Sequence, residues 1–199
     1  MTINDISTIR TGLVVARKKK NAESFQTNKY KLLNLKCISQ EGNVDLELLD
    51  DYEVSEQLKE DYLTKMGDIL VRLSAPYTSV IINKVNLCGI VVPSHFAIIR
   101  VNRKIAVPEY VFWSIRRNKS KMTLMQNSSG STAFGTISSG LIGSLSITNL
   151  PISKQKIIGN LMILAEREEE LIQKLSKEKK KYNSLLLDGI YNELKRGNR

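Results

Sequence analysis

The sequence has few of the residues that build cross-links, metal sites and catalytic centres. Its 199 residues include 2 cysteines, 1 histidine and 4 prolines. Cys37 and Cys88 are too few for a disulfide framework or a metal knuckle, so we expect two reduced core thiols, as in a cytosolic protein. The single His95 fits no catalytic triad that the sequence specifies, and we expect it to be structural. We therefore predict no catalytic residue and no metal site.

Long hydrophobic runs and N-terminal targeting signals are also missing. No apolar run reaches the roughly 18 residues that a membrane span requires. The first residues have neither the basic region nor the apolar segment of a secretory signal. The glycine-rich loops of P-loop and dinucleotide-binding proteins are missing too. These features predict a cytoplasmic protein that needs no membrane and holds no nucleotide cofactor.

Acidic residues are scarce relative to basic ones, with 20 Asp and Glu against 30 Lys and Arg, for a net charge of +10. Such an excess favours a polyanionic partner, nucleic acid or an anionic membrane, although it is also a plain solubility feature in some proteins. The charge is uneven, because residues 41–68 contain ten acids and two bases, whereas residues 69–150 contain nine bases and one acid. We expect acids and bases to occupy separate faces, of which the basic one tracks phosphates.

The first 150 residues have a mixed pattern of strands and helices. Alternating or continuous apolar residues predict strands at Tyr30–Ser39, Ile69–Leu73, Ser79–Asn83, Gly89–Val92 and Phe96–Val101. The acidic segment Val44–Tyr62 has a partly helical pattern, and Pro108 suits the first turn of a helix that continues through Val111, Phe112 and Ile115. Residues 137–147 predict a short helical turn that leads into a last strand.

The sequence changes character at Pro151. From Ser153, a predicted N-cap, to Arg196 it forms one proline-free amphipathic pattern of about 43 residues, or about 65 Å as a helix. Its apolar stripe exceeds what one small domain can cover, so we expect it to pair with another helix. Two seam positions are Glu168 and Glu178. We predict two domains, 1–150 and 151–199, with homodimerisation through the seam residues Leu161, Leu164, Leu171, Leu175, Tyr182 and Leu185.

Four segments resemble the specificity subunits of type I restriction-modification systems. Ile9-Arg10-Thr11-Gly12 looks like the start of a target recognition domain, and Met66–Arg72 contains the family's Gly-Asp-Ile-Leu strand. Val107–Phe112 is similar to its Pro-Glu-Tyr helix start. The most specific segment runs from Gly130-Ser131-Thr132 to Gln155–Ile158 and resembles the exit into the coiled coil. Ser153-Lys154 stands where the family has a second proline and an acid.

This resemblance implies an α/β (α+β) target recognition domain followed by a long coiled-coil helix. It implies a non-catalytic subunit that recognises double-stranded DNA and directs a methyltransferase subunit and a restriction subunit. S-adenosylmethionine and ATP would be held by those partner subunits only. Family members usually have two recognition domains and two long helices, whereas this chain has one of each. A half-subunit is therefore implied, of which two copies would read an inverted, two-part DNA site.

Three regions combine basic residues with hydroxyls and amides, the groups that contact phosphates and base edges. We expect base reading from Arg72 and Tyr77, which follow a rigid strand; alternatively they are a surface strand end and a packed loop anchor. The basic run at residues 17–20 either attracts phosphates or is a solvated loop. The stretch from Gln126 to Thr132 either contacts DNA or forms a turn. The candidates are Arg17, Lys18, Lys19, Lys20; Arg72, Tyr77, Thr78; and Arg116, Arg117, Lys119, Gln126, Ser128, Ser129, Ser131 and Thr132.

Two other functions fit the same composition. One is a coiled-coil adaptor whose basic domain binds protein or an anionic surface. The other is the recognition domain of a modification enzyme whose catalysis belongs to another chain. Salt-sensitive, sequence-selective binding to duplex DNA separates a DNA-recognition subunit from the adaptor.

Overall fold

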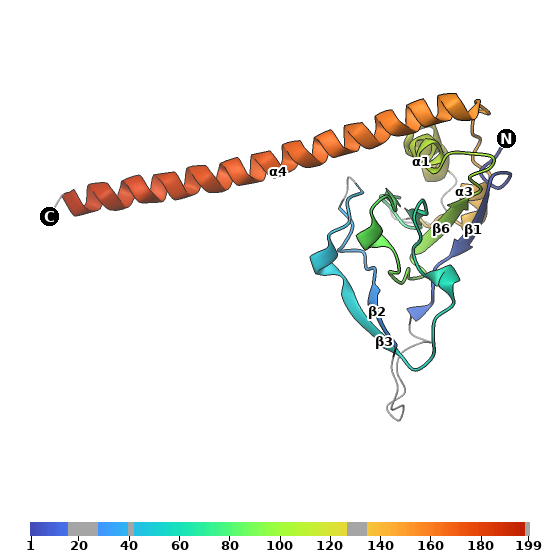
Figure 1. Cartoon of the computed structure of the whole chain (residues 1–199), viewed down its shortest axis with the longest axis horizontal. Coiled ribbons are helices and arrows are strands. Elements are labelled where there is room, and N and C mark those ends of the chain that lie inside the picture. Colours follow the sequence, from blue (N-terminus) through green and yellow to red (C-terminus); the bar gives the residue numbers. More distant parts are fainter. Residues whose placement is uncertain (16–27, 40–41, 127–134, 198–199) are drawn as a thin grey trace. The chain divides into compact units, whose positions relative to one another are not determined.

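The computed structural model describes residues 1–15, 28–39, 42–126 and 135–197. The chain consists of two compact units, Met1–Gly159 and Asn160–Arg199. Helix α4 (Ile152–Gly197) contributes its first two turns to the first unit and the rest to the second (Figure 1). The predicted α+β domain followed by a long C-terminal helix is confirmed.

The first unit is built on a four-stranded antiparallel sheet. Its strand order is β1 (Ser7–Thr11), β6 (Phe96–Val101), β4 (Ile69–Arg72) and β5 (Ser79–Ile81). Figure 1 shows β1 and β6 side by side, as their pairing requires. The apolar residues of β4 and the first half of β6 are at most 1% exposed, so both faces of the central strands are covered. Burial on both faces explains why these strands have continuous apolar runs.

A second sheet of two strands, β2 (Asn28–Leu32) and β3 (Asp50–Val54), corrects two sequence predictions. The predicted strand Tyr30–Ser39 ends early because Asn34 Oδ1 accepts hydrogen bonds from the N–H groups of Lys36 and Cys37, which closes a turn. The predicted partial helix at Val44–Tyr62 is two short 3-10 turns, Leu46–Leu48 and Glu60–Tyr62, on either side of β3.

The expected separation of acids and bases onto different faces is also wrong in this region. Lys31 Nζ lies 2.8 Å from a carboxylate oxygen of Asp51, and Lys29 Nζ lies 3.7 Å from one of Glu53. Both pairs are cross-strand partners in the register of β2 and β3. The acidic segment therefore neutralises the lysines opposite it.

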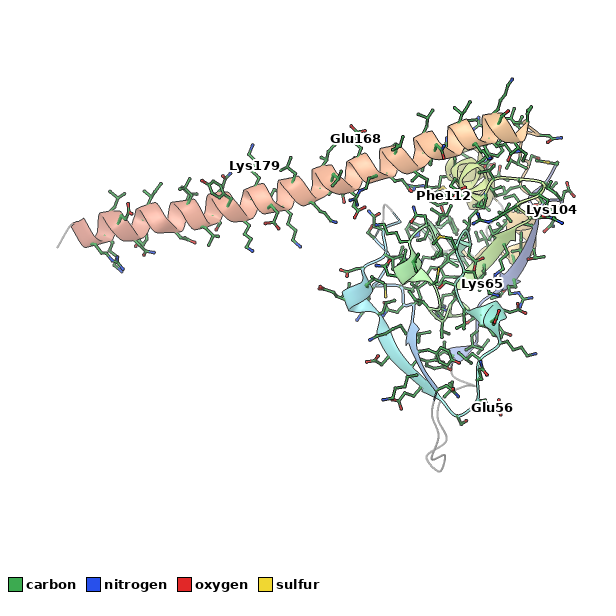
Figure 2. The ribbon with its side chains drawn as sticks, in the orientation of Figure 1. Glu56, Lys65, Lys104, Phe112, Glu168 and Lys179 are labelled. Atoms are coloured by element: carbon green, nitrogen blue, oxygen red, sulfur yellow. The ribbon has the colours of Figure 1, made fainter. Side chains whose placement is uncertain are left out.

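Three shorter helices complete the first unit: α1 (Pro108–Arg116), α2 (Asn118–Gln126) and α3 (Ser139–Gly143). Helix α1 packs on β5 and β6 through its buried face, and Phe112 lies among the densely packed side chains of the domain (Figure 2). The segment at Gly89–Val92 is not a strand, although Val91 forms single bridges with Leu32 and Leu63. The predicted strand after α3 is likewise a single bridge, between Ser146 and Thr2.

The start of α4 is locked to the start of α1. The fully buried Gln155 accepts a hydrogen bond at Oε1 from the Val107 N–H (2.9 Å) and donates from Nε2 to the Leu150 carbonyl (2.8 Å). At Gly159 a Cβ atom would lie 2.8 Å from Cβ of Glu109, so a side chain would push the helices apart. The helix begins at Ile152, so the predicted N-cap Ser153 lies inside its first turn.

The second unit is the remainder of α4. Arg167, Glu170 and Lys174 form ion pairs along the helix surface. Side chains such as Glu168 and Lys179 project outward from it (Figure 2). In the described part of the chain no helix is long and apolar enough to cross a membrane. The six predicted seam residues are 49–69% exposed: Leu161, Leu164, Leu171, Leu175, Tyr182 and Leu185.

Candidate nucleic-acid interface

The strand register brings three connections together at one end of the four-stranded sheet. Thr11 is opposite Ala97, Arg72 is opposite Phe96, and Val71 is opposite Ser79. Strands β1 and β4 therefore end where β5 and β6 begin. We call this region the loop end; it consists of Gly12–Val15, Arg72–Thr78 and Pro93–His95.

Backbone hydrogen bonds join these connections to one another. The Leu73 N–H donates to the His95 carbonyl (2.9 Å), and the Ser94 N–H donates to the Leu13 carbonyl (2.7 Å). Gly12 is buried, and its backbone packs directly against that of Pro93. A Cβ atom at Gly12 would lie 2.3 Å from the Pro93 carbonyl oxygen. The loop end is thus a connected backbone scaffold that holds side chains in fixed positions.

Arg72 is the candidate base-reading residue whose geometry fits that role best. It is the last residue of β4 and half-buried, and its Nε donates a hydrogen bond to Ser74 Oγ (3.1 Å). Among the described residues its terminal guanidinium nitrogens donate no hydrogen bond and form no ion pair. A guanidinium fixed at Nε, with both terminal nitrogens free, is suited to bidentate contact with a guanine or a phosphate.

Tyr77 has the alternative role considered for it, that of a packed loop anchor. It is 9% exposed, and its hydroxyl donates a hydrogen bond to the Gly135 carbonyl (2.9 Å). Its φ of 55° places it in the left-handed region within the tight turn that joins β4 to β5. Because the ring is covered and the hydroxyl proton is engaged, we withdraw Tyr77 as a base-reading candidate. Thr78, the next residue, is half-buried.

The loop between β4 and β5 also contacts residues 136 and 137, which follow the stretch of candidates from Gln126 to Thr132. The Ile137 N–H donates to the Leu73 carbonyl (2.8 Å), and Ser74 forms a bridge with Thr136. Gln126 is exposed at the end of α2. The other candidates of that stretch, Ser128, Ser129, Ser131 and Thr132, lie outside the described residues.

The side chains of most of the remaining basic candidates are not described. The run Arg17, Lys18, Lys19 and Lys20 lies outside the described residues, but Val15, just before it in sequence, lines a cavity of about 410 Å³ with Pro93 and His95 at the loop end. The side chain of Lys119 is likewise not described.

Arg116 is the last residue of α1, and Arg117 is the residue after it. The guanidinium carbon of Arg116 lies 5.2 Å from the Phe112 ring centre, and that of Arg117 lies 5.0 Å from the Trp113 ring centre. Arg117 lines a cavity with Ser144–Thr148, a segment hydrogen-bonded to the residues that precede β1. The structure therefore places Arg117 away from the loop end, since the loop end follows the opposite end of β1.

His95 is a residue of the loop end that sequence reasoning assigned to a structural role. Its side chain is exposed, and its carbonyl is fixed by the Leu73 N–H. The signal that would have found it is its place directly before a buried strand, at the end of the sheet where Arg72 is the last residue of another.

Two acids of the first unit, Asp61 and Asp68, pair with Arg100 of β6. Asp68 is buried and lies 3.1 Å from Arg100 Nε. Burial raises the pKa of the Asp68 carboxyl above its usual value, and the hydrogen bonds from Arg100 and from the Lys65 N–H oppose this rise. Asp61 pairs with both Arg100 and Arg10. These bases are neutralised within the domain and are not available to a polyanion.

Comparison with solved structures identifies the fold. A chain from a structure of complex assembly and conformational transition of the type I R-M system matches with a TM-score of 0.61 and 16% identity, covering 94% of this chain and 46% of that one. The HsdS subunit from Thermoanaerobacter tengcongensis matches with a TM-score of 0.60 and 17% identity over 94% of this chain and 46% of that one. This chain has the fold of half a type I specificity subunit.

The half-subunit fold is also found in the type I restriction-modification S subunit from M. genitalium, with a TM-score of 0.55 and 13% identity over 87% of this chain and 40% of that one. The chain spans about half the length of the S subunits that it matches. No family model and no curated protein matches the sequence. At these identities the similarity establishes the fold that the sequence motifs predicted.

Proposed function

We propose that this chain is a sequence-specific DNA-recognition subunit of a type I restriction-modification complex. The observation that carries the proposal is the fold match, which covers 94% of this chain and 46% of a specificity subunit. The loop end supports it, because three connections of different sequence origin meet there with the Arg72 guanidinium partly free. A rigid strand end that presents an arginine has the geometry for reading guanine.

Two copies of the half-subunit would pair through α4. The six apolar seam residues are at least 49% exposed in the single chain, and burying them against a second helix would be favourable. The helix has 46 residues and a length of about 69 Å. A symmetric pair of this kind would read an inverted, two-part DNA site.

The chemistry would belong to partner subunits. In this proposal a methyltransferase subunit binds S-adenosylmethionine, and a restriction subunit uses ATP, while this chain selects the site. The isolated, purified chain should then show no methyltransferase or nuclease activity with either cofactor added. Robust turnover by that preparation would contradict the proposal.

The direct test is co-expression with a type I methyltransferase subunit from the same organism, followed by sequencing of the methylated adenines. We expect a defined recognition sequence for the wild-type chain and relaxed selectivity at one position for Arg72→Ala, at a cost of about 1–3 kcal/mol in binding. Arg103→Ala is the matched control, because Arg103 is exposed and donates to the Met66 carbonyl at the opposite end of β4. An unchanged recognition sequence and efficiency in Arg72→Ala would remove Arg72 from the interface.

Pairing is tested by replacing Leu164, Leu171 and Leu175 with lysine, which places three charges in the seam. We expect light scattering to show a dimer for the wild-type chain and a monomer for this variant. The control adds the same charge outside the seam, at the exposed Gln173, Ser176 and Asn183. A wild-type chain that is monomeric at high concentration would contradict self-pairing.

The adaptor function is separated by DNA binding itself. A recognition subunit binds its cognate duplex far more tightly than unrelated duplexes and loses affinity steeply with salt. An adaptor with a basic domain would bind all duplexes alike.

A further inference from the structure

A second cavity in the first unit has the chemistry of an anion site. It has a volume of about 270 Å³ and is lined by residues of α1, α2 and the segment Ser144–Thr148. Its lining contains one guanidinium, from Arg117, and no acidic residue among the described residues. The other polar groups are the hydroxyls of Ser114, Ser120, Thr123, Ser144, Ser146 and Thr148.

Arg117 is held in place without being neutralised. It caps the C-terminus of α1 with extended backbone (φ −60°, ψ 146°), at the break before α2 begins. Its guanidinium carbon lies 5.0 Å from the centre of the Trp113 ring, which itself stacks on Tyr110. Stacking uses the face of a guanidinium and leaves its N–H edges free to donate. Arg117 forms no ion pair with any described residue.

The segment Ser144–Thr148 adds uncommitted hydrogen-bond donors. The Leu145 carbonyl accepts from the Ile3 N–H (3.1 Å), and the Ile147 N–H donates to the Met1 carbonyl (2.9 Å). Because backbone groups alternate along an extended segment, the N–H of Ser146 faces away from residues 1–3. Among the described residues it donates to none, and neither do the exposed hydroxyls of Ser146 and Thr148.

Two backbone carbonyls beside the cavity accept hydrogen bonds from hydroxyl groups. The Tyr110 hydroxyl donates to the Thr148 carbonyl (2.8 Å), and the Ser120 hydroxyl donates to the Ser114 carbonyl (2.8 Å). The hydroxyl of Ser144 donates to the Leu141 carbonyl (2.9 Å), so Ser120 and Ser144 shape the wall and contribute no donor. The surrounding sequence is basic, with Glu109 as the single acid of residues 69–150.

We propose that this cavity binds a tetrahedral oxyanion of the phosphate type. Arg117 supplies the charge, and Ser146 and Thr148 supply hydrogen bonds from a backbone N–H and two hydroxyls. Two sources share this chemistry: the phosphate backbone of a nucleic acid, and free phosphate or a small phosphorylated molecule. The cavity lies beside the residues that precede β1, whereas the loop end follows the last residue of β1. Anion binding in the cavity can therefore be tested separately from DNA recognition at the loop end.

The first experiment titrates the full chain with inorganic phosphate at constant ionic strength, by calorimetry and by amide NMR. We expect the amide resonances of Ser146 and Thr148 to shift, and Arg117→Gln to weaken binding by about 10- to 100-fold. Ser146→Asp, which adds a carboxylate at an exposed position, should abolish binding while leaving Arg117 in place. Lys104→Gln, an equal loss of charge at an exposed residue outside the cavity, should bind as the wild-type chain does.

The second experiment measures the salt dependence of binding to a non-cognate DNA duplex. If inorganic phosphate does not bind but Arg117→Gln lowers the salt slope by about one, and Lys104→Gln does not, the occupant is a DNA backbone phosphate. Phosphate binding that Arg117→Gln and Ser146→Asp leave unchanged would overturn the proposal. The proposal would also be overturned if the wild-type chain bound no phosphate and Arg117→Gln left the salt slope of DNA binding unchanged, provided that the variant unfolds at the same temperature as the wild-type chain.

Discussion

Replacing Gln155 with leucine tests how the long helix is attached to the first unit. Gln155 is fully buried and makes two hydrogen bonds to backbone groups that precede helices, the Val107 N–H before α1 and the Leu150 carbonyl before α4. Leucine has a similar volume and forms neither bond. The substitution therefore leaves one buried donor and one buried acceptor unpaired without opening a large cavity.

The expected loss follows from the cost of unpaired buried groups. Each costs about 1–3 kcal/mol, so the free energy of unfolding should fall by about 2–6 kcal/mol. Domains of ordinary stability have about 5–15 kcal/mol in total, so this is a substantial fraction. For a chain of this size the unfolding temperature should drop by at least about 4 °C.

Urea unfolding followed by the fluorescence of the single tryptophan, Trp113, measures this loss directly. Trp113 lies in α1, whose N-terminus Gln155 holds, so its signal reports the first unit. The matched control is Gln173→Leu, at an exposed position of the same helix, which should change stability by less than about 0.5 kcal/mol. Equal unfolding midpoints for Gln155→Leu and the wild-type chain would refute the reasoning.

Three further changes are informative. Gly12→Ala should cost about 1–3 kcal/mol in urea unfolding, because the added Cβ meets a backbone carbonyl; Gly189→Ala, in open space, should be neutral or stabilising. Arg100→Met leaves the buried Asp68 carboxylate without its cation and should cost about 3–5 kcal/mol at neutral pH. Burial then raises the folded-state pKa of Asp68 further above its unfolded value, so this deficit should shrink as the pH falls through that pKa. A chain truncated at the boundary between the units should keep the sheet signal in circular dichroism, lose most helical signal and be monomeric; a dimer would place the pairing surface elsewhere.

Elements with a strong local signal could be predicted from the sequence. Strand β4 has three consecutive apolar residues after Gly67-Asp68, and β6 alternates little because it is buried on both faces. Helix α1 begins at Pro108, which fits the first turn, and α4 has a long apolar repeat without proline. In each case the residues that determine the element lie within a few positions of one another.

Strand β3 could not be predicted in this way. Its acidic residues have weak strand propensity, and the ion pairs that accompany its pairing come from Lys29 and Lys31, some twenty residues earlier. The same reason applies to Gln155, whose hydrogen-bond partner Val107 is 48 residues away. Neither partner is visible in a local pattern.

The candidate interface shows the same division. Composition indicated three regions, and the apolar run before Arg72 predicted the strand at whose end it lies, while base reading by Arg72 stays a prediction. Three placements became known only from the tertiary structure: Tyr77 is buried, Arg117 lines a different cavity, and His95 lies at the loop end. A side chain's exposure depends on which segments pack over it, and those segments are distant in sequence.

The sequence by itself determined the mixed α+β fold, the buried strand β4, the long C-terminal helix with its apolar repeat and the basic excess. Each of these depends on composition or on periodicity over one or two turns. The tertiary structure decided which charges remain available, because Asp61 and Asp68 neutralise Arg10 and Arg100 through contacts made between separate strands and loops. It also decided which loops share one end of the sheet, since strand register is set by pairing between residues far apart in the chain.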